Sequence, residues 1–192
     1  ILGVNTVGRL NEIIAADQIE DFIHTAEALH EKKLARIADE ISSKSGTRLV
    51  LIAGPSSAGK TTFAKRLTVH LSVNGFKPVT HATDDYFVGE DKNPTDENGQ
   101  PDYEHIEAVD LELFNSDLLK LVNGDEIEIP RFNFETKKRE YRGEKMRLEE
   151  DQILMIEGIH GLNPRLTEMV PAARKYKVYV SALTQLSVDS NN

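Results

Sequence analysis

The chain has 192 residues, which is enough for one domain of ordinary size with an appendage and for a buried core. A formal net charge of −9 disfavours a surface that binds nucleic acid by general electrostatics, and the absence of cysteine excludes disulfides, thiolate metal sites and cysteine nucleophiles. No apolar run approaches the ~18 residues of a membrane span and no signal peptide is recognisable, so we expect a cytoplasmic protein without membrane contact. Because the sequence does not start with methionine, we expect it to begin inside a longer protein.

Residues 1–46 differ in pattern from the rest of the chain. From Asp17 onward, apolar residues recur at steps of three and four, which predicts a long amphipathic helix. Asp17 and Glu20 resemble a capping box at its start, and Gly46 suits its end. A shorter helix is expected before it, over residues 10–16. Nothing in this region indicates chemistry, so we interpret it as a helical linker or packing extension.

From residue 47 onward, buried strands alternate with helices. Short apolar runs predict strands at 48–54, 77–83, 152–158 and 175–180, and helical patterns lie at 61–75 and 109–124. Two more strands are expected at 126–130 and 145–150. Residues 89–105 are polar and too long for a simple connection, so they are expected to be functional or mobile. This alternation predicts an α/β fold with a doubly wound parallel sheet over residues 47–192.

Residues 54–61, GPSSAGKT, match the phosphate-binding pattern G-x-x-x-x-G-K-[ST] at every fixed position. Glycines let backbone N–H groups converge on phosphate oxygens, and the helix that follows directs its positive end at them. Lys60 is expected to reach the β- and γ-phosphates, and the Thr61 hydroxyl to bind Mg²⁺. The pattern therefore predicts a P-loop NTPase fold that binds a nucleoside triphosphate. The expected nucleotide contacts are Gly54, Ser56, Ser57, Ala58, Gly59, Lys60, Thr61 and Thr62.

Three acidic residues follow predicted strands. Asp84 and Asp85 come directly after one strand, and Glu157 ends another. Alone, the Asp pair is more typical of a solvated turn, and Glu157 is as easily a residue at the edge of the core. Beside a P-loop, the carboxyl ends of these strands are expected to form one crevice. The sequence has no N-K-x-D pattern, which disfavours a GTPase.

Five segments together resemble the uridine kinase and phosphoribulokinase group of P-loop kinases. They are GPSSAGKTTFAKRL, DDYF, DYEHIEAVD, RFNFETKKR and ILMIEGIHGLN, in this order and at compatible spacing, and the resemblance covers about residues 47–183. The preceding helical region resembles the linker of bacterial uridine-kinase-like proteins that carry a TGS domain and a threonyl-tRNA-synthetase-like domain upstream. The resemblance implies an ATP- and Mg²⁺-dependent kinase that phosphorylates a nucleoside, most simply the 5′-hydroxyl of uridine or cytidine.

The resemblance also implies roles for individual residues near the phosphates. Lys60 and Asp85 would be catalytic, with Asp85 as the general base for the acceptor hydroxyl. Thr61, Asp85 and Glu157 would lie at the metal.

On the acceptor side, Tyr103 and Glu104 would face the nucleoside, and Phe132 and Phe134 would line the base pocket. From the residues alone, the two phenylalanines are equally well explained as core residues on one face of a strand.

Two departures from the family pattern leave alternatives open. Lys137 stands where uridine kinases have a histidine that reads the pyrimidine, and a lysine only donates hydrogen bonds, so an anionic acceptor is an alternative. The chain also stops before the position of the family's arginine-bearing lid and last helices, and a nucleotide-binding regulatory module with little turnover is a second alternative. The expected partner is a small-molecule acceptor, with no direct nucleic acid contact, and a homo-oligomer is left open.

We predict that Lys60→Ala abolishes ATP-dependent phosphorylation and weakens triphosphate binding, because a charge-assisted contact in a desolvated site is lost. Titration calorimetry with Mg-ATP measures the binding. An affinity equal to that of the parent chain would show that the loop has another role.

Overall fold

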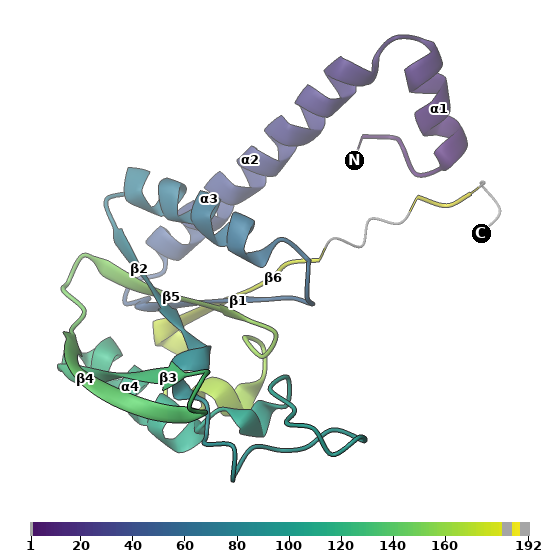
Figure 1. Ribbon diagram of the computed structural model, residues 1–192. Coiled ribbons are helices and arrows are strands. Elements are labelled where there is room, and N and C mark those ends of the chain that lie inside the picture. Colours follow the sequence, from purple (N-terminus) through teal and green to yellow (C-terminus); the bar gives the residue numbers. More distant parts are fainter. Residues whose placement is uncertain (1, 182–185, 189–192) are drawn as a thin grey trace.

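The fold is described from a computed structural model, for residues 2–181 and 186–188. Two N-terminal helices precede an alternation of strands and helices (Figure 1). The helices are α1 (Val7–Ala15), α2 (Ile19–Ser43), α3 (Lys60–Val73) and α4 (Leu111–Asn123), and the strands are β1 (Leu49–Ala53), β2 (Lys77–Ala82), β3 (Ile127–Asn133), β4 (Lys138–Met146), β5 (Gln152–Gly158) and β6 (Lys175–Tyr179). Short 3₁₀ helices are η1 (Thr83–Tyr86), η2 (Ile106–Ala108), η3 (Pro164–Thr167) and η4 (Ala172–Arg174).

A four-stranded parallel sheet forms the centre of the fold, with the order β2-β5-β1-β6. Its strands lie where the four apolar runs predicted them, and α3 and α4 lie at the two predicted helical patterns. All four carboxyl ends therefore reach the same edge of the sheet. The predicted α/β fold with a parallel sheet is confirmed.

The two faces of this sheet pack into two separate apolar clusters. Because side chains alternate along a strand, neighbouring residues of β1 and β5 enter opposite clusters, as expected for a sheet buried on both sides. Leu49, Leu51, Leu154 and Ile156 pack toward α4, whereas Val50, Ile52, Ile153 and Met155 pack toward α2 and α3. In Figure 1, α2 and α3 lie on one side of the sheet, and α4 and the β3–β4 hairpin lie on the other.

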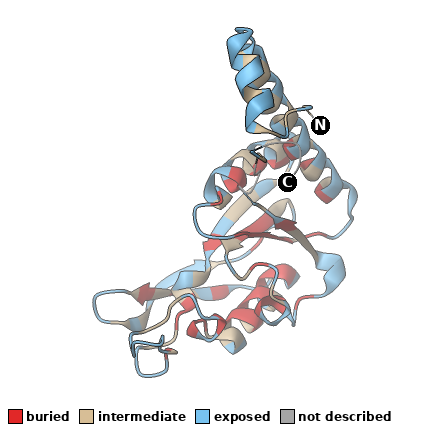
Figure 2. Cartoon of the chain, turned by 90° about the vertical axis from the view of Figure 1, so that its right-hand side faces the viewer, coloured by how far each residue is buried: buried red, intermediate tan, exposed pale blue. Residues whose placement is uncertain are grey.

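The N-terminal helices project away from the sheet (Figure 1). No residue of α1 is buried, and the first buried residue of α2 is Leu34 (Figure 2). The expected capping box is wrong: Asp17 has a φ of 58°, and Gln18 takes the N-cap position without a side-chain hydrogen bond. Asp17 instead lies in the turn between the two helices. No helix in the described part of the chain is long and apolar enough to cross a membrane.

The last turns of α2 belong to the core on the α3 side of the sheet. Leu34, Ala38 and Ile41 are at most 1% exposed and pack in the same cluster as α3. The division of the chain at residue 46 stays a prediction, and these contacts place the end of the predicted extension inside the α/β core.

The segment between the two expected strands at 126–130 and 145–150 is a β-hairpin rather than a connection. Here β3 and β4 pair antiparallel, with Asn133 opposite Lys138. The Asn133 side chain accepts hydrogen bonds from the N–H groups of Glu135 and Thr136, and Lys137 has a φ of 56°. This local side-chain bonding turns the chain back on itself. The strand expected at 145–150 is therefore wrong in its position, since β4 ends at Met146.

Candidate active site

A cavity of about 760 Å³ opens at the carboxyl edge of the sheet. Its walls come from β1 and the start of α3, from β2 and η1, from β5 and the loop after it, and from the long loop before η2. This is the crevice where parallel α/β sheets bind ligands. Chain segments more than 100 residues apart in the sequence meet there.

The P-loop joins β1 to α3 at one end of this cavity. Ser57 and Gly59 have φ values of 59° and 84°, in the left-handed region, and α3 begins directly afterwards at Lys60. A Cβ on Gly54 would lie 2.2 Å from the carbonyl oxygen of Val180, so only glycine fits there.

The start of α3 carries backbone donors that are available to an anion. Phe63 donates its N–H to the carbonyl oxygen of Gly59 at 2.9 Å. In the described part of the chain, the N–H groups of residues 59–62 have no backbone acceptor. Unpaired N–H groups at a helix N-terminus form a binding site for phosphate oxygens. The loop therefore has the geometry that a triphosphate requires.

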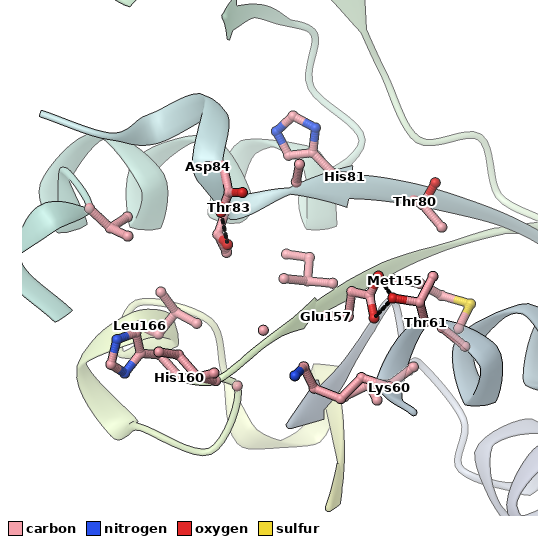
Figure 3. Close-up of a pocket in the computed structure, with 18 of the residues that line it drawn as sticks. Lys60, Thr61, Thr80, His81, Thr83, Asp84, Met155, Glu157, His160 and Leu166 are labelled. Carbon is pink, nitrogen blue, oxygen red and sulfur yellow. Dashed lines mark hydrogen bonds between the residues drawn. The ribbon is translucent and has the colours of Figure 1, made fainter. Parts of the chain in front are cut away.

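Lys60, Thr61 and Glu157 lie together at this end of the cavity (Figure 3). The Lys60 Nζ donates to the carbonyl oxygen of Pro55 at 2.9 Å. The Thr61 hydroxyl donates to the Glu157 carboxylate, with Oε1 at 2.8 Å and Oε2 at 3.0 Å. A hydroxyl beside a carboxylate provides the hard oxygen ligands that Mg²⁺ prefers.

The expected metal ligands are thus brought together only in part. Asp85, the third of them, is paired with Arg131 instead. Within residues 2–181 and 186–188, no three His, Asp or Glu side chains form a ready-made metal site. The residues present still fit Mg²⁺ that keeps several water ligands and is held by one carboxylate, one hydroxyl and phosphate oxygens.

Asp84 and Asp85 point in different directions from η1. Asp84 lines the cavity, and Figure 3 shows it across the space from Thr61. Asp85 is outside the cavity lining, its side chain is 16% exposed, and its carboxylate accepts a hydrogen bond from Arg131 at 2.9 Å. Partial burial raises the pKa of the Asp84 carboxyl, a hydrogen bond from Thr83 opposes this, and the charge of Asp85 raises it further. The role of Asp85 as a base stays a prediction, and Asp84 is the carboxylate that the fold brings to the cavity.

The other end of the cavity is aromatic and acidic. Tyr103, Glu104 and Phe134, which the resemblance assigns to the acceptor side, line it together with Phe87. Phe132 is 7% exposed and does not line the cavity, because its ring packs edge-on against Phe87 at 5.5 Å between centroids. Phe132 is thus placed as a core residue and not as a residue that lines the cavity.

Lys137 contacts this aromatic wall but does not line the cavity. Its Nζ is 5.5 Å from the centroid of the Tyr103 ring, a cation–π contact, and the residue is not among those that line the cavity. The expected place of Lys137 beside an acceptor stays a prediction.

Sequence reasoning missed three residues of this region. His160 lines the cavity, Phe87 completes the aromatic wall, and Arg131 holds Asp85. His160 and Phe87 do lie inside two of the recognised segments, ILMIEGIHGLN and DDYF, so their positions were marked although their roles were not. Arg131 begins a third such segment, RFNFETKKR, but its role could not be inferred, because its partner Asp85 is 46 residues away in the chain.

Known proteins share this architecture and this sequence pattern. A uridine kinase from Clostridium botulinum (strain 657 / Type Ba4) is 32% identical over 136 residues, which cover 69% of this chain and 61% of that protein. A uridine kinase from Halobacterium salinarum is 30% identical over 112 residues, 58% of this chain and 48% of its own length. This chain thus spans about half the length of that relative, and 26% of a uridine-cytidine kinase C from Dictyostelium discoideum.

A solved structure, described as "a Possible Uridine Kinase from Bacillus stearothermophilus", has the same fold. The TM-score is 0.55 at 22% identity, over 77% of this chain and 80% of that one. The model of the Phosphoribulokinase / Uridine kinase family matches residues 49–189, which is most of the chain. The chain belongs to the Phosphoribulokinase / Uridine kinase family.

Proposed function

We propose that this chain transfers the γ-phosphoryl group of ATP to the 5′-hydroxyl of a pyrimidine nucleoside. The observation that carries this proposal is a single cavity with two chemically different ends. One end holds Lys60 and the Thr61–Glu157 pair, directly after the P-loop glycines, and the other holds Asp84, Glu104 and aromatic rings. Phosphoryl transfer needs a phosphate site and a hydroxyl site that face each other.

The phosphate end supplies positive charge and backbone donors. Free N–H groups at the start of α3 and the Lys60 ammonium would bind phosphate oxygens, and the charge on Lys60 would offset negative charge on the transferring group. Thr61 and Glu157 would hold Mg²⁺, which in such sites bridges and neutralises phosphate oxygens. This part of the proposal rests on the spacing of the P-loop and on the Thr61–Glu157 hydrogen bond.

At the acceptor end, we assign the general base to Asp84 rather than to Asp85. A base must be within hydrogen-bond reach of the hydroxyl proton, and of the two carboxylates Asp84 is the one that lines the cavity. Asp85 is engaged by Arg131, whose guanidinium also binds Glu144 at 2.7 Å. Arg131 thereby ties η1 to the β3–β4 hairpin, and Asp85 would hold η1 in place.

The charges of the acceptor end favour a neutral acceptor. Asp84 and Glu104 both line it, and two carboxylates would repel a phosphorylated substrate. The cation that suggested an anionic acceptor, Lys137, lies over the Tyr103 ring instead. Aromatic walls suit the flat face of a nucleobase. These features support a nucleoside over an anionic acceptor, and the relatives named uridine kinases point the same way.

An acceptor screen tests the proposal. ATP consumption is measured with uridine, cytidine, a purine nucleoside or a sugar phosphate. We expect consumption that depends on uridine or cytidine, since a pyrimidine with a free 5′-hydroxyl matches both ends of the cavity. Consumption that depends on the sugar phosphate would support the anionic acceptor. Tight ATP binding without turnover for any acceptor would support the regulatory module.

Two isosteric variants separate the neighbouring carboxylates. Asp84→Asn should lower kcat by about 100-fold or more, because a general base is lost, and leave ATP affinity nearly unchanged. Asp85→Asn is the matched control, and we expect a decrease of only a few-fold, roughly the loss of a charged hydrogen bond. The reverse order would return the base to Asp85, and small equal effects would make both residues structural.

A further inference from the structure

One hydrogen bond links two loops that both line the cavity. The Nε2 of His160, in the loop after β5, lies 2.8 Å from the backbone carbonyl oxygen of Glu104, in the loop before η2. Both residues line the cavity, and they are 56 positions apart in the sequence. Figure 3 shows His160 at the edge of the space that Lys60, Glu157 and Asp84 surround.

The partner determines which nitrogen of His160 carries a proton. A carbonyl oxygen only accepts hydrogen bonds, so Nε2 must be the donor. Protonation of the ring adds a proton at Nδ1 and leaves the Nε2 donor in place, so the bond is made by both the neutral and the charged imidazole.

His160 stands on a backbone segment that is packed against the sheet. A Cβ on Gly161 would lie 3.1 Å from the Cβ of Ala53, the last residue of β1, so this loop lies directly on the strand end. The carbonyl oxygen of His160 also accepts the N–H of Asn163 at 2.8 Å. The position of the imidazole is thus set by the core of the fold.

The loop that carries Glu104 has much weaker support of its own. Before Glu104 its backbone bonds are internal, such as the one from the Asp102 N–H to Pro94 O at 2.7 Å, and the first backbone bond to another segment after Glu104 is the one that Ala108 O accepts from the Val88 N–H at 2.8 Å. The neighbouring ion pair between Arg165 and Glu107 has side chains that are 53% and 57% exposed, and such pairs contribute little. The chain after Glu104 is anchored separately, because Ile106 and Ala108 are buried in the core. At Tyr103 and Glu104 themselves, the contacts that the described part of the chain makes with other segments are the ring contacts of Tyr103 and the bond from His160.

We propose that His160 is a positioning residue that holds the Tyr103–Glu104 segment at a fixed place opposite the phosphate end. The loop after β5 is packed on the end of β1, and the bond from His160 fixes the irregular loop of the acceptor wall to it. His160 then affects acceptor affinity without contacting the phosphates or the reacting hydroxyl. This inference rests on the proposed nucleoside kinase activity, since it assigns the acceptor to that wall.

Steady-state kinetics of His160→Ala and His160→Gln test the role. Loss of one hydrogen bond should raise the KM for the nucleoside roughly 3- to 10-fold, with kcat and the KM for ATP within about two-fold of the parent. Glutamine has an amide N–H at similar reach and should restore most of the affinity. His24→Ala, at an exposed position on α2, is the matched control and should change nothing. An unchanged nucleoside KM in the alanine variant, or no rescue by glutamine, would overturn the proposal.

Hydrogen exchange tests the link independently of catalysis. In His160→Ala, the amides of residues 102–106 should exchange faster, while those of α3 stay as in the parent chain. Unchanged exchange at 102–106 would show that the bond does not hold the loop. If the parent chain consumes no ATP with any nucleoside, the proposed function fails, and the exchange result alone decides whether His160 positions the loop.

Discussion

The parallel register of β1, β2 and β5 brings Lys60, Asp84 and Glu157 to one edge of the sheet. Glu157 of β5 is aligned with Ile52 of β1 and with Ala82 of β2. The residues that directly follow these positions are the P-loop, the loop after β5 and η1, so all three leave the sheet at one edge. A slip of one residue would move each side chain of the shifted strand from one core to the other, and the close packing of the two cores disfavours this. The same burial that stabilises the sheet therefore aligns the site.

Charge is distributed unevenly along the cavity that this alignment creates. Backbone N–H groups and Lys60 lie at one end, and the carboxylates of Asp84 and Glu104 lie at the other. At the positive end, Glu157 accepts a hydrogen bond from the Thr61 hydroxyl. Outside the cavity, the negative charge of Asp85 is paired with the guanidinium of Arg131. Within the described residues, the hydrogen bond to the Asp84 carboxylate is the long one from Thr83, at 3.4 Å, and Asp84 lines the cavity. The molecule thus separates a carboxylate that maintains structure from one that faces the cavity, although they are adjacent in sequence.

The sequence was most informative where a local pattern has one structural solution. The P-loop, with its fixed spacing of Gly54, Gly59 and Lys60, could be located together with its flanking strand and helix. The hairpin of β3 and β4 could not, because its turn depends on the side chain of Asn133 and its register shifts between Glu128 and Pro130. Likewise, no periodic pattern shows which of two adjacent aspartates faces a cavity, since that depends on how η1 is rotated by the Arg131 contact. Interactions between distant segments, such as that of His160 with Glu104, leave no trace in one sequence.

The most direct test of this account is a crystal structure with a non-hydrolysable ATP analogue, Mg²⁺ and uridine bound together. The account predicts that the triphosphate lies on the P-loop and that the 5′-hydroxyl lies within about 3.2 Å of the Asp84 carboxylate, which is hydrogen-bond reach. The nucleobase should lie against Tyr103 and Phe134. A nucleoside bound outside this cavity, or a 5′-hydroxyl directed at Asp85, would contradict the assignment of one cavity with a phosphate end and an acceptor end.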